Sequence, residues 1–263
     1  MPLQDILATL SGSLVGFVLG LIGGGGSILA VPLLVYVVGV SSPHVAIGTS
    51  AVAVALSALA NLMGHARQGN VKWRCALVFA AAGVIGAALG STFGKQFDGQ
   101  KLLILFGGLM VLIAGLMFFK KSTDGNVDVR LTRTTAPDLM PYLLVYGVGV
   151  GALSGFFGIG GGFLVVPGLM AATDMPLIFA IGSSLVSVAA FGLTTAGNYA
   201  LSGMIDWQLV AFFIVGGITG GLLGRQLAGI LAPKKQLLAQ IFAGIVATVG
   251  GYIVWRGLAV LSA

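Results

Sequence analysis

Apolar residues fill ten segments of the chain, separated by short breaks that are rich in glycine or polar residues. Most segments approach the ~20 residues that a helix needs to cross the hydrocarbon core of a bilayer. The pattern predicts helices over residues 5–22, 27–40, 44–66, 72–94, 101–119, 141–158, 162–173, 177–201, 207–227 and 236–256. Segments 27–40 and 162–173 are shorter than a full span, and each follows a cluster of glycines. The sequence therefore predicts an all-α, polytopic helical membrane protein.

The composition supports this fold class. Hydrophobic residues make up 57% of the chain and charged residues only 8%, whereas a soluble domain is about 25% charged. Cys75 is the only cysteine, which excludes an intrachain disulfide. The chain shows no nucleotide-binding motif, no metal-ligand spacing and no set of catalytic residues. We therefore expect no enzyme activity, no cofactor and no bound metal. The net charge of +6 is attributed to cytoplasmic loops and not to a nucleic-acid surface.

The two halves of the chain repeat one another. A glycine-rich run with a Val-Pro pair recurs at an offset of 135 residues, and Trp73 recurs as Trp207 at an offset of 134. The long polar stretch 120–138 separates the copies. We predict an N-terminal repeat over 1–119, a linker over 120–138 and a C-terminal repeat over 139–263. Internal duplication of this kind is typical of secondary transporters.

The distribution of Lys and Arg favours repeats of inverted topology. An odd number of crossings in each half places ten basic residues on one side of the membrane and three on the other. Four crossings in each half would reduce this split to eight against five. Because cytoplasmic loops carry the excess of Lys and Arg, we expect the linker to be cytoplasmic and both termini to lie outside. The count leaves open whether each glycine-linked pair is two full spans or a re-entrant hairpin, giving about 8–10 membrane segments.

The strongest local signal is the run GLIGGGGSILAVPLL at residues 20–34, which recurs as GFFGIGGGFLVVPGL at 155–169. Glycine destabilises a helix by about 1 kcal/mol per residue relative to alanine, so both runs predict a break inside the membrane. A helix that begins after the break, at Ser27 or Gly162, would present free N–H groups and its positive dipole end to an anion. The alternative is that these glycines serve close packing alone, which is the expected role of the isolated glycines elsewhere.

The glycine pattern resembles the sulfite exporter TauE/SafE family of bacterial membrane transporters. It is formed by Gly16, Gly20, Gly23, Gly25, Gly26 and Val31-Pro32, and again by Gly151, Gly155, Gly158, Gly160, Gly161 and Val166-Pro167. The resemblance covers nearly the whole chain. It implies movement of a small sulfur-containing anion, such as sulfite, thiosulfate, sulfoacetate or a related organosulfonate, across the bacterial inner membrane.

The predicted anion site combines the two breaks with hydroxyl and amide side chains of the helices that follow. Such groups donate hydrogen bonds to an oxyanion without adding charge, and the sequence places no carboxylate in the middle of a segment. The predicted substrate-binding residues are Gly25, Gly26, Ser27, Thr49, Ser50, Asn61, Gly160, Gly161, Gly162, Ser183, Ser184 and Asn198.

Structural roles compete with each of these assignments. The hydroxyls can bond to a carbonyl one turn earlier, and buried asparagines can join helices. His65 and Tyr199 occupy equivalent positions near two helix ends. For His65 we expect a satisfied interfacial side chain, with titration during transport as the alternative.

Two functions compete. The leading hypothesis is a secondary transporter, working in export and coupled to a proton or counter-ion. The alternative is a passive anion channel, or an importer of sulfur oxyanions, on the same fold.

Overall fold

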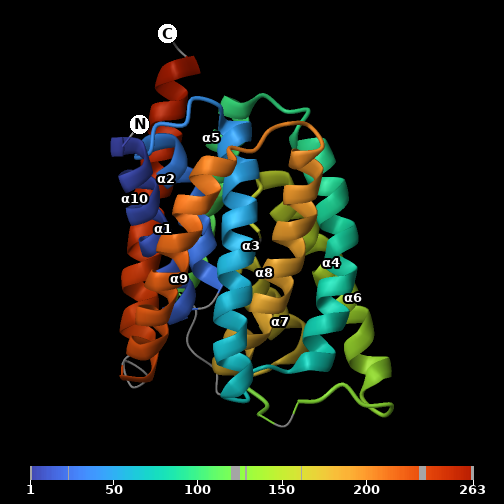
Figure 1. Ribbon diagram of the computed structural model, residues 1–263. Helices are drawn as coiled ribbons and strands as arrows, with labels where there is room; N and C mark the ends of the chain where they lie inside the picture. The colour runs from blue at the N-terminus through green and yellow to red at the C-terminus, as the bar shows by residue number, and fades with distance from the viewer. Residues whose placement is uncertain are drawn as a thin grey trace.

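The computed structural model describes residues 2–22, 24–119, 125–127, 129–160, 162–230 and 235–261. The regular structure in these ranges is entirely helical, as predicted. The elements are α1 (Pro2–Ile22), the 3-10 helix η1 (Gly24–Leu29), α2 (Ala30–Tyr36), α3 (Pro43–Arg67), α4 (Trp73–Gly94), α5 (Gly99–Phe119), α6 (Ala136–Phe157), α7 (Gly162–Thr173), α8 (Leu177–Ala200), α9 (Trp207–Ile230) and α10 (Lys235–Leu261) (Figure 1).

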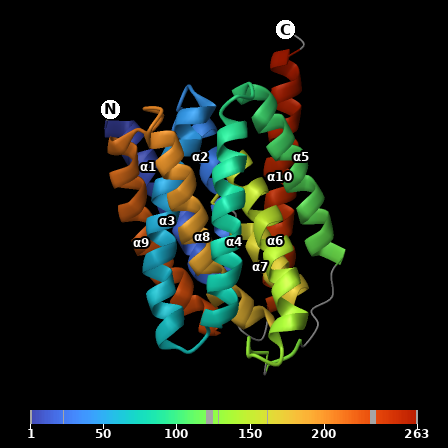
Figure 2. The same ribbon diagram turned by 90° about the vertical axis from the view of Figure 1, so that its right-hand side faces the viewer.

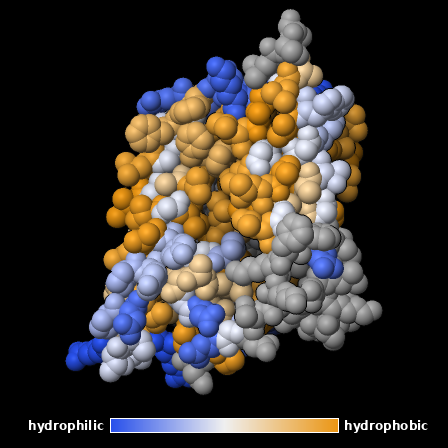
Figure 3. Space-filling view, turned by 180° about the vertical axis from the view of Figure 1, so that it is seen from behind, coloured by the Kyte–Doolittle hydropathy of each residue, from blue (hydrophilic) through white to orange (hydrophobic). Residues whose placement is uncertain are grey.

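Seven helices of the described chain are long and apolar enough to cross a membrane, namely α1, α3, α4, α5, α6, α8 and α9. They stand side by side in one bundle (Figures 1 and 2). Ile85, Leu112 and Val145 are all more than half exposed, at 61%, 58% and 71%. Figure 3 shows apolar side chains across the middle of one face and hydrophilic ones at its two ends. Such a surface fits lipid around the middle and water at the ends.

Several helix boundaries differ from the sequence prediction by a few residues, and two of these differences are informative. α6 begins at Ala136, inside the predicted linker 120–138, because a proline fits its first turn without losing a helical hydrogen bond. The α-helix expected to begin at Ser27 begins at Ala30, because Gly24–Leu29 forms a 3-10 helix. Linker residues 120–124 and 128 lie outside the described residues.

Glycines bring two pairs of helices into backbone contact. A Cβ atom at Gly16 of α1 would fall on the carbonyl oxygen of Gly217 in α9. The equivalent contact in the other half joins Gly151 of α6 to the carbonyl oxygen of Gly83 in α4. For the isolated glycines Gly83 and Gly217 the expected packing role is confirmed, and Gly16 and Gly151 share it.

The helices of the two halves run in opposite directions. The order of the glycine contacts shows that α1 and α3 are parallel to α9, whereas α6 is parallel to α4. The short loop 68–72 reverses the chain direction, so α3 and α4 are antiparallel. Therefore α1 runs opposite to α6, its counterpart in the second half (Figures 1 and 2).

The loops gather at two ends of the bundle. The terminal end, as we name it, contains both chain termini and loops 37–42, 95–98 and 201–206; the linker end contains loops 68–72 and 174–176 and the described residues of 125–135. Lys72 Nζ donates to the carbonyl of Val127 at 2.8 Å, and Arg74 Nη1 donates to that of Leu131 at 3.2 Å. Basic residues of loop 68–72 and of the first turn of α4 thus hold the linker against this end.

Substituting Gly151 with alanine should lower the thermal unfolding midpoint of the purified protein. The added methyl group would meet the Gly83 carbonyl and push α4 from α6, and overpacking costs about 1–3 kcal/mol. Gly149→Ala is the matched control, because a Cβ there has no neighbour within 4 Å. It should leave the midpoint unchanged or raise it, since alanine is the better helix former. Equal midpoints for the two variants would contradict the packing role.

Candidate functional site

The first glycine break packs against the helix that follows the second break. η1 of the first half packs against α7 of the second, and both contact α8. At the second break, a Cβ on Gly160 would lie 3.4 Å from Val54 Cγ1 of α3 and 3.8 Å from Val188 Cγ1 of α8. The second break therefore lies between the central helices α3 and α8, and the first break lies against the helix that follows it.

The first break is closed by packing. Gly25, Gly26 and Ser27 are buried in η1. A Cβ on Gly26 would lie 2.6 Å from the backbone nitrogen of Leu19 and 2.7 Å from the carbonyl oxygen of Val15. Gly26 is thus required by the hairpin of α1 and η1, whether or not an anion binds. The open helix terminus expected at Ser27 is absent, because 3-10 hydrogen bonds occupy the N–H groups there.

The second break keeps the predicted geometry. Gly160 has a φ angle of +62°, a left-handed conformation that glycine adopts at little cost. The helix α7 begins at Gly162, as predicted, and contains Pro167. Gly162 is buried, and Gly161 lies outside the described residues.

Thr49 and Ser183 anchor loops of the opposite half. Thr49 Oγ1 accepts a hydrogen bond from the backbone N–H of Asp206 at 3.0 Å. Ser183 Oγ accepts one from the N–H of Lys72 at 2.9 Å. The two hydrogen bonds are equivalent in the two halves: Thr49 and Ser183 are 134 positions apart, and so are Lys72 and Asp206. Each hydroxyl therefore ties the loop before α9 or α4 to a central helix, a role that neither sequence interpretation included.

The hydroxyls of the two halves do not converge on one point. Thr49 and Ser183 each lie five residues from the valines that flank Gly160, Val54 and Val188. Since α3 and α8 are antiparallel, these displacements add to roughly 15 Å along the helix axes. One site can therefore contact the hydroxyls of one half only, Thr49 and Ser50 or Ser183 and Ser184, and not all four as predicted.

Ser50 and Ser184 bond to carbonyls of the preceding turn. Ser50 Oγ donates to the carbonyl of Ile47 at 3.0 Å, and Ser184 Oγ donates to that of Ile181 at 2.7 Å. These are the structural roles that the sequence left open as alternatives. An anion would have to displace these bonds to use either hydroxyl as a donor.

Both asparagines also bond within the protein. Asn61 Nδ2 donates to a carbonyl one turn earlier in α3 at 3.0 Å. Asn198 Nδ2 donates to Ser91 Oγ at 2.7 Å and to Thr92 Oγ1 at 2.9 Å, and its Oδ1 accepts from Lys95 Nζ at 2.7 Å. Asn198 therefore joins α8 to α4, which is the helix-joining alternative.

Each central helix carries a buried stripe of residues spaced by four, which the sequence analysis did not identify. The α3 stripe is Thr49, Ala53, Ser57, Asn61 and His65, and the α8 stripe is Ser183, Ser187, Phe191, Thr195 and Tyr199. The two stripes match position by position at an offset of 134. Applied strictly, this offset pairs Asn61 with Thr195, and it could have identified both stripes from the sequence.

Polar atoms of the stripes lack partners among the described residues. They are the hydroxyls of Ser57, Ser187, Thr195 and Tyr199 and both ring nitrogens of His65, and in α6 the hydroxyl of Ser154 shares this property. The satisfied side chain expected for His65 is therefore not found. A buried polar group without a partner costs about 1–3 kcal/mol, so these groups mark where a polar solute would be stabilised.

The two stripes differ in what fills their seams with the neighbouring helices. In the α3 seam, Ser57 faces Gly217 of α9. In the α8 seam, the Phe191 ring covers Gly83 of α4 and stacks on Phe79, with ring centroids 6.5 Å apart. The α3 seam is therefore the more polar of the two.

The interior contains no carboxylate among the described residues. The chain has seven aspartates and no glutamate. Those described lie in first turns or loops, and they are Asp5, Asp98, Asp138, Asp174 and Asp206. No group of three or more His, Cys or Asp residues that could hold a metal occurs in the described chain.

A bundle of membrane-length helices around two glycine-broken hairpins defines a multi-pass membrane protein with a broken-helix centre, the architecture of secondary transporters. The chain belongs to the sulfite exporter TauE/SafE family, whose model matches residues 8–253. It is therefore a membrane transporter.

Several relatives are similar along their whole length. A protein of Xylella fastidiosa (strain 9a5c) named "Probable membrane transporter protein" is 51% identical, with 100% of both chains covered. "Probable membrane transporter protein YunE" of Bacillus subtilis is 27% identical over 96% of this chain and 98% of its own. No solved structure gives a significant match.

Thr49→Val should lower the thermal unfolding midpoint, because it leaves the N–H of Asp206 without its acceptor. The expected loss in unfolding free energy is about 1–3 kcal/mol. Ser183→Ala should act in the same way on the N–H of Lys72.

Ser50→Ala is the control next in sequence, since it removes only a bond to the preceding turn. Its midpoint should stay close to wild type. If Ser50→Ala lowered the unfolding midpoint as much as Thr49→Val, the hydrogen bond from Asp206 to Thr49 would contribute no more to stability than a bond within the helix.

Proposed function

We propose that the protein exports a small sulfur-containing anion, such as sulfite, thiosulfate, sulfoacetate or a related organosulfonate, across the bacterial inner membrane. The observation that carries this proposal is the direct packing of η1 against α7, with both in contact with α8. It brings the first glycine break against the helix that follows the second, in an interior where no described carboxylate lies. Membership of the sulfite exporter family supports the class of substrate.

The anion would be held by neutral donors near the second break. An anion in a medium of low dielectric must replace its lost hydration by fixed hydrogen-bond donors. Gly160 takes its left-handed conformation, and α7 begins at Gly162, next to Val54 of α3 and Val188 of α8. Ser187 is a buried hydroxyl without a described partner in the turn of α8 that contains Val188, whose Cγ1 would lie 3.8 Å from a Cβ on Gly160. Neutral donors keep the affinity moderate, which permits release.

We infer an inverted repeat with the linker end in the cytoplasm. The opposite directions of α1 and α6 support the inversion. The described basic residues are unequally divided: the linker end has Arg67, Lys72, Arg74, Arg130, Arg133, Arg225 and Lys235, and the terminal end has Lys95, Lys101 and Arg256. An excess of Lys and Arg marks the cytoplasmic side.

Transport can be measured with the purified full-length protein in proteoliposomes. The panel is radiolabelled sulfite, thiosulfate, sulfoacetate, taurine and sulfate, with chloride as a control anion. We expect one sulfur-containing anion to accumulate against its gradient when a proton or counter-ion gradient is imposed. Flux that only follows the electrochemical gradient would instead assign a passive channel. No movement of any sulfur anion would refute the proposal.

Variants of the stripe hydroxyls separate stability from transport in the same assay. Ser187→Ala and Thr195→Val remove buried hydroxyls without described partners, so their unfolding midpoints should not fall. Loss of a donor to an anion should reduce transport at least ~10-fold. Thr248→Val, on the exposed surface of α10, is the control and should transport at the wild-type rate. Wild-type transport in both stripe variants would place the route elsewhere.

The orientation predicts which loops an impermeant thiol reagent reaches. In a Cys75→Ser background, Ser202→Cys marks the terminal end and Thr134→Cys marks the linker end, both at exposed positions. Reagent added outside intact inner-membrane spheroplasts should label Ser202→Cys alone. Labelling of both positions from the same side would end the inverted-repeat model.

A further inference from the structure

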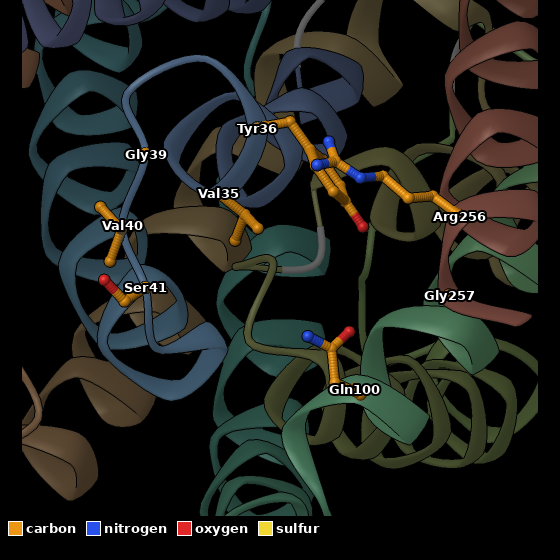
Figure 4. Close-up of a pocket in the computed structure, with 8 residues that line it drawn as sticks. All are labelled: Val35, Tyr36, Gly39, Val40, Ser41, Gln100, Arg256 and Gly257. Carbon is orange, nitrogen blue, oxygen red and sulfur yellow. The ribbon is translucent and has the colours of Figure 1, made fainter. Parts of the chain in front are cut away.

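A cavity of about 400 Å³ opens at the terminal end, away from the two breaks. It lies between the segment that follows α2, the first turn of α5 and the last turns of α10 (Figure 4). Its polar side chains are Tyr36, Ser41, Gln100 and Arg256, and none of its lining residues is acidic. The cavity therefore combines one fixed positive charge with neutral hydrogen-bonding groups.

Arg256 is held in place by aromatic side chains. Its guanidinium lies over the Tyr36 ring, 5.3 Å from the centroid, and Nη1 donates to the hydroxyl of Tyr252 at 3.0 Å. Tyr36 and Tyr252 pack edge to face, with centroids 5.6 Å apart. These contacts orient the guanidinium at the cavity without neutralising it.

Most donors of this guanidinium are uncommitted within the described chain. Arg carries five N–H donors, and the bond to Tyr252 uses one of them. Lys95, a partly buried cation at this end, is bonded to Asn198 and Ser202 instead. At the terminal end, Arg256 is thus the cation that lines a cavity and has donors available to a ligand.

Gln100 and Ser41 can add donors from other sides of the cavity. Figure 4 shows Gln100 rising from α5 toward the space below Arg256, with Ser41 across from both. The neighbouring carboxylate of Asp98 is engaged by the backbone N–H groups of Gln100 and Lys101, at 3.1 and 3.0 Å. Its charge is therefore partly compensated at the start of α5.

We propose that this cavity binds an oxyanion, with Arg256 as its charged ligand and Gln100 and Ser41 as neutral ones. A planar guanidinium suits the paired oxygens of a sulfur oxyanion or of a phosphate. The oxyanion has two sources, a small anion from water or the headgroup of an anionic phospholipid. If the ligand is a small anion, the cavity is a binding site that the anion occupies between the aqueous phase and the interior transport pathway. This role rests on the proposed function.

Binding can be read from Trp255, whose ring centroid is 6.3 Å from that of Tyr252. In a Trp73→Phe, Trp207→Phe background, the full-length protein in phosphatidylcholine nanodiscs is titrated with sulfate and thiosulfate. We expect a saturable fluorescence change that Arg256→Ala abolishes. Arg256→Lys keeps the positive charge but loses the paired N–H donors of the planar guanidinium, and it should weaken binding at least ~10-fold.

The matched control is Lys101→Ala, an exposed cation at the same end that does not line the cavity. It should bind with wild-type affinity. An equal loss in Lys101→Ala and Arg256→Ala would reduce the effect to the general charge of this end and overturn the site. A fluorescence change that persists in Arg256→Ala would overturn it as well.

The source of the oxyanion is tested by adding phosphatidylglycerol to the nanodiscs. Competition with sulfate that depends on Arg256 identifies the headgroup as the occupant. Unchanged sulfate binding, with a raised KM for transport in Arg256→Ala and an unchanged maximal rate, identifies the small anion. If wild type binds sulfate but transports no sulfur anion, the site stands and the proposed function fails. If transport occurs but no Arg256-dependent binding is seen, the site fails alone.

Discussion

Backbone contact between helices at glycine is the constraint on which the arrangement depends. Lipid is as apolar as the helix surface, so burial of apolar side chains gives little force between helices in a membrane. Gly16 against Gly217 and Gly151 against Gly83 allow a closeness that any side chain would prevent. Because α1 and α6 lead into the two breaks, these contacts with α9 and α4 of the opposite half determine where the breaks stand.

The duplicated framework carries two unlike halves. Gly26 is packed against the backbone of α1, whereas Gly160 takes a left-handed conformation between α3 and α8. Ser57 leaves one seam polar, whereas Phe191 fills the other with an aromatic ring. The first half thus combines a tightly packed break with a polar seam, and the second half combines a left-handed glycine with an aromatic seam.

Charge is kept away from the centre and concentrated at the ends. Neutral groups in the core avoid the cost of burying a charged residue and would bind an anion without trapping it. The basic excess at the linker end would attract anions over a range set by the Debye length, about 8 Å at physiological salt. Arg256, oriented by Tyr36 and Tyr252, gives the opposite end a local site in place of a diffuse field.

The sequence alone determined the all-α fold, the ten helical segments and the position of both breaks, because apolar run length and glycine clustering act locally. The repeat offset of 134 residues also relates the two buried stripes to each other, so they could have been found from the sequence. Tertiary structure decided the partners of the polar groups. Thr49 bonds to Asp206, which is 157 positions away in the chain, and Gly26 meets α1 only once the hairpin closes. The sequence is the same whether a hydroxyl binds a substrate or holds a loop in place. Only the atoms packed around the hydroxyl in the folded protein decide between these roles.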